Sequence, residues 1–172
     1  MSFPELISRE KIHSRVQELA KEIERDFAGE EIIVVGVLKG SFIFCADLIR
    51  EINLPITLDF ISVSSYEGTE STGELKINLD IKSKIEGKNV ILVEDIIDTG
   101  LTISSLITRF KKNNPKSLKV ASLLYKPARI QHKVDIDYLA FEIEDHFVIG
   151  YGLDFNGSYR ELPYVGIYNG EV

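Results

Sequence analysis

Residues 90–110, VILVEDIIDTGLTISSLITRF, concentrate the side chains that could do chemistry. An apolar run ends at two adjacent acids, Glu94 and Asp95, and a third acid, Asp98, follows in the same loop. The apolar stripe of a helix begins after the loop, so the intervening turn lies at a helix N-terminus, where backbone N–H groups bind anions. The residues of this turn are Thr99, Gly100, Leu101 and Thr102. The pattern predicts a phosphate site.

The three acids cannot themselves be phosphate ligands. A carboxylate about 4 Å from a phosphate charge would cost on the order of 4 kcal/mol at an effective dielectric constant near 20, which exceeds what a helix N-terminus contributes. Carboxylates instead accept hydrogen bonds from hydroxyl groups or coordinate a divalent cation. A phosphorylated sugar offers both a phosphate for the turn and hydroxyl groups for the acids.

Other kinds of site remain open when the loop is considered alone. The loop is not a Walker A motif, because it lacks the second glycine and the lysine that reaches the β- and γ-phosphates. It therefore suits a single monophosphate. Adjacent acids at a strand end are also found as solvated loop charges, and an Asp in this place serves as nucleophile in phosphoacceptor proteins and phosphatases.

Composition and charge set limits on the class of protein. The 172 residues, of which 44% are hydrophobic and 27% charged, suit one globular domain, residues 1–172. The formal net charge of −7 argues against a nucleic-acid surface, because such surfaces depend on clustered Lys and Arg. We expect a cytoplasmic protein without membrane partners, because the sequence shows neither a secretory signal nor 18 consecutive apolar residues.

Strands and helices are expected to alternate along most of the chain. Ser8 is placed to cap a helix that continues to Phe27 and stops at Gly29, and further helices are expected in FIFCADLIREI and after residue 102. Besides the apolar run that opens residues 90–110, the expected strands cover residues 32–37, 56–64, 75–81, 118–125, 137–143, 147–152 and 163–168. This alternation predicts an α/β fold with a parallel sheet covered on both faces.

Ligands of such sheets bind beyond the carboxyl ends of the strands. The segments LKG, EDIIDTG and YKP all fall at such ends, which places them at one edge of the predicted sheet. The polar, glycine-containing segment SYEGTESTGE joins two strands and is expected to be a mobile loop.

VILVEDIIDTGLT resembles the phosphoribosyl pyrophosphate motif of the type I phosphoribosyltransferases almost letter for letter. LKGSF, SSYEGTESTGE, LLYKP and FVIGYGLDFNGSYRELPYVG extend the similarity to the hypoxanthine-guanine phosphoribosyltransferase family, over residues 31 to 168. The resemblance implies a central, mostly parallel sheet flanked by helices, with a small hood over the site. It also implies transfer of a phosphoribosyl group.

The resemblance assigns roles to the acidic loop. Glu94 and Asp95 would hold the ribose hydroxyls, and the segment from Asp98 to Thr102 would bind the 5-phosphate. Asp98 would also lie beside N7 of the purine and take up its proton. The alternative role for Asp98 is a helix N-cap, a position that Asp often occupies. Leu101 replaces a polar or basic residue of other members, so we expect no extra phosphate contact there.

Further matches concern the purine base. Lys126 would donate a hydrogen bond to the purine 6-oxygen, and an ammonium group cannot accept one from the 6-amino group of adenine. Phe147 would stack on the base, and Val148 would offer backbone groups to its edge. Without the family context, Lys126 would be a solvated charge and Phe147 a core residue.

The remaining matches concern pyrophosphate and metal. Lys39 and Gly40 correspond to the pyrophosphate loop, in which the peptide bond before the Lys is typically cis. Asp154 matches a magnesium ligand and Arg160 a pyrophosphate contact, although both could be ordinary surface charges. Two further residues, Ser65 and Tyr66, match the mobile loop that covers the reacting centre.

The resemblance implies a purine salvage enzyme that transfers the 5-phosphoribosyl group from phosphoribosyl pyrophosphate to N9 of hypoxanthine or guanine. Mg²⁺ would be required, with Glu94, Asp95 and Asp154 as the expected metal ligands. The family also suggests a homodimer or homotetramer. The main alternative is a regulator without catalytic activity that senses phosphoribosyl pyrophosphate, and related enzymes that use xanthine or a pyrimidine are nearer competitors.

Overall fold

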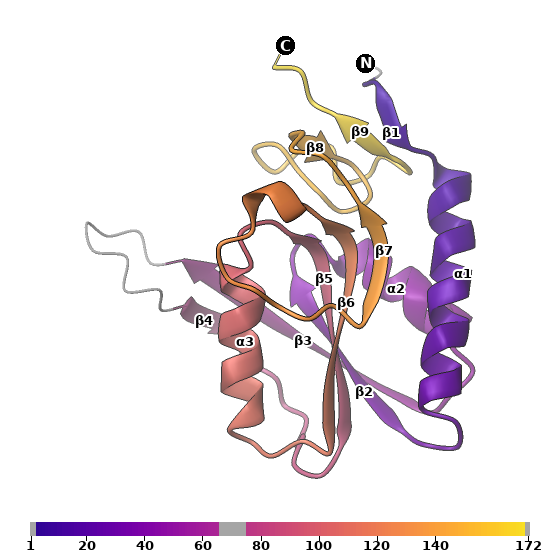
Figure 1. The fold of residues 1–172 in the computed structure, drawn as a ribbon, viewed down its shortest axis with the longest axis vertical. Coiled ribbons are helices and arrows are strands. Elements are labelled where there is room, and N and C mark those ends of the chain that lie inside the picture. Colours follow the sequence, from indigo (N-terminus) through magenta and orange to yellow (C-terminus); the bar gives the residue numbers. More distant parts are fainter. Residues whose placement is uncertain (1–2, 66–74, 171–172) are drawn as a thin grey trace.

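A six-stranded sheet forms the centre of the computed structural model, which describes residues 3–65 and 75–170 (Figure 1). The strands follow the order β4-β3-β2-β5-β6-β7, and all neighbours are parallel except β3 and β4. Their bounds are β2 (Ile32–Leu38), β3 (Ile56–Ser65), β4 (Leu75–Leu79), β5 (Asn89–Ile97), β6 (Ser117–Tyr125) and β7 (Tyr138–Glu142). The predicted α/β class and mostly parallel sheet are confirmed.

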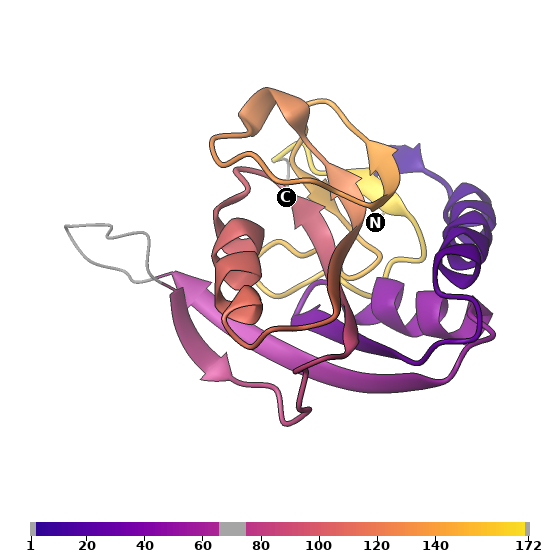
Figure 2. The ribbon, with the colours of Figure 1, turned by 60° about the horizontal axis from the view of Figure 1, so that its bottom comes forward.

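Helices cover both faces of this sheet, as Figures 1 and 2 show. One face carries α1 (Arg9–Asp26) and α2 (Phe42–Glu51), which contact each other, and the opposite face carries α3 (Leu101–Lys111). Ser8 caps α1 as expected, because its Oγ accepts a hydrogen bond from the Lys11 N–H at 3.2 Å. A short 3-10 helix, η1 (Pro127–Arg129), follows β6.

The alternation of side chains along β5 divides the hydrophobic core in two. Ile91 and Val93 pack with the buried residues of α1 and α2, whereas Val90 and Leu92 pack with those of α3. A central strand buried on both faces therefore appears in the sequence as a continuous apolar run. Cys45 lies in the first of these cores, 1% exposed, and burial raises the pKa of its thiol to about 12.

A small antiparallel sheet of order β1-β9-β8 forms the hood above the carboxyl ends of the central strands (Figure 1). Its strands are β1 (Glu5–Ile7), β8 (Val148–Ile149) and β9 (Val165–Ile167). The sequence did not predict β1, and it predicted β8 and β9 as longer strands. Most of the segment expected to be a mobile loop, residues 66–74, lies outside the described residues. Among the described helices, none is long and apolar enough to cross a membrane.

Candidate functional site

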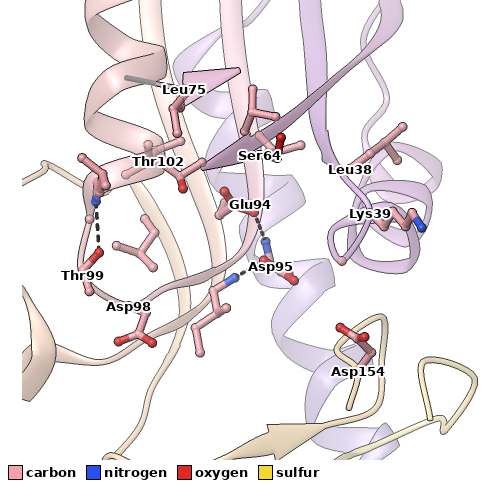
Figure 3. A pocket seen from close by; sticks show the side chains of 18 of the residues that line it. Leu38, Lys39, Ser64, Leu75, Glu94, Asp95, Asp98, Thr99, Thr102 and Asp154 are labelled. Atoms are coloured by element: carbon pink, nitrogen blue, oxygen red, sulfur yellow. Dashed lines mark hydrogen bonds between the residues drawn. The ribbon is translucent and has the colours of Figure 1, made fainter. Parts of the chain in front are cut away.

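A cleft of about 330 Å³ opens at the carboxyl ends of β2 and β5, beside the first turn of α3 (Figure 3). Four separate segments supply its polar side chains. These are the β2–α2 loop, Ser64 of β3, the end of β5 with the β5–α3 loop, and the hood segment after β8. The site residues that line it are Lys39, Gly40, Glu94, Asp95, Asp98, Thr99, Gly100, Leu101, Thr102, Asp154 and Arg160. The sheet edge predicted from LKG and EDIIDTG is therefore the edge that carries the cleft.

The adjacent acids at the end of β5 are held by the backbone that follows them. Glu94, only 7% exposed, accepts a hydrogen bond through Oε1 from the Asp95 N–H at 3.0 Å, and Asp95 accepts one through Oδ1 from the Ile96 N–H at 2.7 Å (Figure 3). Burial raises the pKa of Glu94 well above its ordinary value, and the charge of Asp95 adds to the effect. Burial also raises the pKa of Asp95, against the opposing effect of hydrogen bonds and of the Arg160 charge. Such a pair is suited to hydroxyl donors or a cation.

The β2–α2 loop packs directly against Asp95. A Cβ atom at Gly40 would lie 1.6 Å from Asp95 Oδ2, so only glycine allows this approach. The peptide bond between Leu38 and Lys39 is cis, as the family resemblance implied. The Lys39 side chain is exposed and points away from Asp95 (Figure 3).

The turn before α3 is held in place by the backbone of the segment after η1. Thr99 O accepts hydrogen bonds from the Gln131 and His132 N–H groups, both at 2.9 Å, and Thr99 Oγ1 accepts one from the Leu101 N–H at 3.4 Å. Gly100 is the N-cap with φ +85°, and a Cβ there would lie 2.1 Å from His132 O. The N-cap role considered for Asp98 is therefore wrong. The first amides of α3, which lack carbonyl partners within the helix, begin at the cleft.

Asp98 instead belongs to a chain of ion pairs that leads away from the cleft. Its Oδ1 accepts a hydrogen bond from Arg129 Nε at 2.5 Å, and Arg129 Nη1 lies 3.5 Å from Asp145 Oδ2. Asp145 Oδ1 in turn lies 3.4 Å from Lys126 Nζ. Sequence reasoning missed Arg129 and Asp145. The available signal was their closeness in sequence to Lys126 and Phe147.

The residues expected to bind the base lie apart from the 330 Å³ cleft. Lys126, at the end of β6, is 6% exposed, so it is not the solvated charge considered as an alternative. Phe147 is 54% exposed, so it is not a core residue, and its ring meets those of Phe155 and Tyr168 edge-on at 5.9 Å each. Val148 is buried in β8. The ion pairs from Asp98 to Lys126 connect this region to the cleft.

Asp154 and Arg160 form one unit in the hood segment. Arg160 Nη2 lies 2.9 Å from Asp154 Oδ1, Arg160 Nη1 donates to Gly152 O at 2.5 Å, and the Gly157 N–H donates to Asp154 Oδ2 at 2.6 Å. Both side chains are partly buried and line the cleft, so they are not ordinary surface charges. Figure 3 shows Asp154 across the cleft from the two acids of β5.

The expected metal ligands do not converge on a single point. No group of three acidic, His or Cys side chains among residues 3–65 and 75–170 is placed to hold a metal ion. Mg²⁺ is usually bound through one or two carboxylates, with substrate phosphates and water completing its octahedron. The carboxylates of Glu94, which is buried, and Asp95, which is partly buried, fit that donor set.

Two expected site residues fall at the limit of the described structure. Ser65 is the last residue of β3, and its backbone pairs with Leu75 of β4. Its side chain lies outside the described part of the structure. Tyr66 lies outside the described residues. Their expected contribution to a covering loop stays a prediction.

Comparison with known proteins places this geometry in a family. The model of the phosphoribosyl transferase domain matches residues 6–156. The hypoxanthine-guanine phosphoribosyltransferase of Dictyostelium discoideum is 43% identical over 171 residues, with 96% of this chain and 95% of that protein covered. A crystal structure of a hypoxanthine-guanine phosphoribosyltransferase from Bacillus anthracis, with a HEPES molecule in its active site, is similar with a TM-score of 0.93. It is 50% identical and covers 97% of this chain and 99% of that chain.

A third relative extends the range of organisms. The hypoxanthine phosphoribosyl transferase of Trypanosoma cruzi, studied for the role of its C-terminal region in oligomeric state and enzymatic activity, is 38% identical with a TM-score of 0.92. The alignment covers 97% of this chain and 92% of that chain. Sequence similarity and fold similarity therefore agree along nearly the whole chain, which belongs to the phosphoribosyltransferase family.

Proposed function

We propose that this chain is a purine salvage enzyme that transfers the 5-phosphoribosyl group of phosphoribosyl pyrophosphate to N9 of hypoxanthine or guanine. The bond from C1 of the ribose to pyrophosphate breaks, the bond from C1 to N9 forms, and the base loses a proton, which gives IMP or GMP. The names of the similar proteins support this reaction. The observation that carries it is the pair of the buried Glu94 and the partly buried Asp95 beside the N-terminus of α3.

The sugar and its 5-phosphate would bind at two adjoining parts of the cleft. The carboxylates of Glu94 and Asp95 would accept hydrogen bonds from the ribose hydroxyls, which would relieve the desolvation that raises the pKa of both acids. The amides of the turn from Thr99 to Thr102 would bind the phosphate. Leu101 has an apolar side chain, so only its backbone would contribute.

The leaving pyrophosphate requires positive charge. Lys39 and the amide of Gly40 lie at one rim of the cleft and Arg160 at another. A guanidinium group matches phosphate oxygens bidentately. Bound Mg²⁺, held by Glu94, Asp95 or Asp154 together with phosphate oxygens, would neutralise the negative charge that develops as pyrophosphate leaves. The side chains of Ser65 and Tyr66 would help to cover the reacting centre.

The base would bind at the region between β6 and the hood. Lys126 Nζ would donate a hydrogen bond to O6, the ring of Phe147 would stack on the base, and the backbone of Val148 would face its edge. Asp98 would accept the proton from N7. Because the Lys126 ammonium is buried and can only donate, adenine, with an amino group at position 6, should be a poor substrate.

We also propose that residues 1–172 form a single domain that assembles as a homodimer or homotetramer and acts in the cytoplasm. The exposed apolar side chains of Phe42 and Leu58, 42% and 41% exposed, are consistent with a protein interface. Light scattering during size-exclusion chromatography should give two or four times the chain mass of 19.4 kDa. A monomer at micromolar concentration would contradict this proposal.

The reaction is tested by offering phosphoribosyl pyrophosphate and Mg²⁺ with adenine, hypoxanthine, guanine and xanthine in separate assays. Nucleotide and pyrophosphate should form with hypoxanthine or guanine and much more slowly with adenine. Omission of Mg²⁺ should abolish the reaction. Binding of phosphoribosyl pyrophosphate without pyrophosphate release for any base would instead support a sensing regulator.

A further inference from the structure

Four side chains of alternating charge connect the end of β6 to the acidic loop. In order they are Lys126, Asp145, Arg129 and Asp98, and we call them the base-edge network. The successive contacts measure 3.4 Å from Lys126 Nζ to Asp145, 3.5 Å from Asp145 to Arg129 Nη1, and 2.5 Å from Arg129 Nε to Asp98 Oδ1. Three separate segments supply these residues.

Arg129 is the link on which this network depends. It contacts its two acids through different nitrogens, Nε for Asp98 and Nη1 for Asp145, and the fixed shape of a guanidinium group sets the distance between them. The pKa of Arg129 is raised by its hydrogen bond to Asp98 and by the charges of both acids. Within the described part of the chain, the Asp98 carboxylate accepts its side-chain hydrogen bond through Oδ1, and Oδ2 is left for a ligand.

The two ends of the network match the two polar atoms on one edge of a 6-oxopurine. O6 requires a donor, which is the Lys126 ammonium, and the N7–H group requires an acceptor, which is the Asp98 carboxylate. The acceptor and donor must therefore be held at a spacing that suits O6 and N7 together. Arg129 and Asp145 connect them, and within residues 3–65 and 75–170 the hydrogen bonds of these two side chains reach one residue of the sugar-phosphate cleft, Asp98.

We propose that Arg129 is a positioning residue for purine recognition, which orients the Asp98 carboxylate toward N7 and, through Asp145, ties it to Lys126. This inference rests on the proposed function. Arg129 should therefore affect the binding and reaction of the purine base but not the binding of phosphoribosyl pyrophosphate. Without Arg129, Lys126 and Asp98 are still present, but nothing fixes the distance between them.

The experiment is a double-mutant cycle with Arg129→Gln and Asp98→Asn, assayed with radiolabelled hypoxanthine so that slow variants can be measured. Arg129→Gln alone should lower kcat/KM for hypoxanthine by about 10- to 100-fold, with KM for phosphoribosyl pyrophosphate within about threefold of the starting protein. In the Asp98→Asn background, Arg129→Gln should change kcat/KM by less than about twofold. The effects of two substitutions are not additive when one residue acts through the other.

Two further variants distinguish the loss of the two contacts of Arg129 from the loss of its charge and from a general effect on folding. Arg129→Lys keeps the charge, but one ammonium group cannot make both contacts, so it should restore less than about a tenth of the lost kcat/KM. Arg109→Gln removes a guanidinium of equal exposure, 45%, from an ion pair with Asp80 outside the site, and it should leave the kinetics unchanged. Thermal melting of each variant checks that it is folded.

Full recovery of activity in Arg129→Lys, or an equal loss from Arg129→Gln in both backgrounds, would overturn the inference. So would a matching rise in KM for phosphoribosyl pyrophosphate. If the unaltered protein makes no nucleotide with any purine, the proposed function fails first. That result is distinguishable from an active enzyme that does not depend on Arg129.

Discussion

The acids at the end of β5 are proposed to bind the ribose, and their position has a consequence for stability. Glu94 is buried beside Asp95, and burial together with mutual repulsion raises its pKa. A carboxyl group whose pKa is raised by folding stabilises the protein at low pH. That contribution is lost as the pH rises from its ordinary value of 4.5 through the raised pKa. The ligand-free protein is therefore destabilised by this site at neutral pH.

Glu94→Gln should stabilise the ligand-free protein while abolishing activity. Gln keeps the oxygen that accepts from the Asp95 N–H but removes the buried charge. We expect Tm to rise by about 2–4 °C at pH 8, the shift that about 1 kcal/mol produces in a chain of this size, and the gain to vanish near pH 4. Calorimetry across this pH range measures the effect, with the exposed Glu86→Gln as control. A lower Tm at pH 8 would contradict the account of this pair.

Lys126→Met tests the proposed contact with O6. Met preserves the buried aliphatic stem, and loss of a hydrogen bond from a charged donor, about 1.5–3 kcal/mol, should lower kcat/KM for hypoxanthine by about 10- to 100-fold. The value of kcat/KM for adenine should fall much less, so the ratio of kcat/KM between hypoxanthine and adenine should decrease. Lys119→Met, at a partly exposed position on the strand that ends just before Lys126, is the matched control. Unchanged discrimination against adenine would remove Lys126 from its proposed role.

At the residue scale, the cleft could be predicted from the sequence because several of its residues are neighbours along the chain. Glu94, Asp95 and the turn before α3 are contiguous, so one motif contains them. Arg129 was missed because its partners lie 31 and 16 positions away, and neither spacing belongs to a recognisable pattern. Ion pairs of that kind are properties of the folded chain.

At the scale of elements, α3 is positioned by its contact with the loop after η1. Gly100, the N-cap with φ +85°, lies directly against His132 O. Because the same turn begins the proposed phosphate site, we expect packing on this side of the helix to affect ligand binding on the other. The backbone of residues 131 and 132 supports the turn through its hydrogen bonds to Thr99 O.

Gly100→Ala and Gly87→Ala together separate backbone strain from close packing. Both glycines have positive φ, but nothing lies within 4 Å of a Cβ at Gly87. Gly87→Ala should lower the free energy of unfolding by about 1–2 kcal/mol, the usual cost of this conformation. Gly100→Ala should lower it by at least about 1 kcal/mol more and raise KM for phosphoribosyl pyrophosphate about tenfold. Equal effects in urea unfolding and kinetics would show that the contact with His132 is unimportant.

In the hood, the exposed ring of Phe147 packs against the rings of Phe155 and Tyr168. Phe155 and Tyr168 stack at 4.3 Å, and both meet Phe147 edge-on. Tyr168→Leu should raise KM for hypoxanthine about 3- to 10-fold, the equivalent of about 0.5–1.5 kcal/mol for an aromatic pair, and leave KM for phosphoribosyl pyrophosphate unchanged. Tyr168→Phe, which retains the ring, should behave like the starting protein. An equal rise in both KM values would mean that the hood acts on the whole site.

Elements were predicted well where local pattern determines them. The apolar runs of β2, β5 and β6 and the stripe of α1 identify buried strands and a helix without reference to the rest of the chain. The strand β1 was missed because three residues carry too little pattern, and its partner β9 lies about 160 positions away. The antiparallel pairing of β4 with β3 likewise depends on tertiary contacts.

At the scale of the whole molecule, the parallel sheet explains why distant segments meet at one site. The strand order β3-β2-β5-β6 places the β2–α2 loop, the β5–α3 loop and the end of β6 side by side, and the hood adds Asp154 and Arg160 from above. The sheet thus supplies one edge with two regions, the cleft proposed for sugar phosphate and a separate region proposed for the base. Sequence reasoning predicted the shared edge but not this separation, which depends on how the hood folds over it.

The most direct test of the account is a crystal structure of the protein with GMP bound. The account predicts both ribose hydroxyls within hydrogen-bond distance, about 2.5–3.0 Å, of the Glu94 and Asp95 carboxylates, and the 5-phosphate on the backbone amides between Thr99 and Thr102. A ribose that contacts neither acid, or a phosphate bound away from that turn, would contradict it.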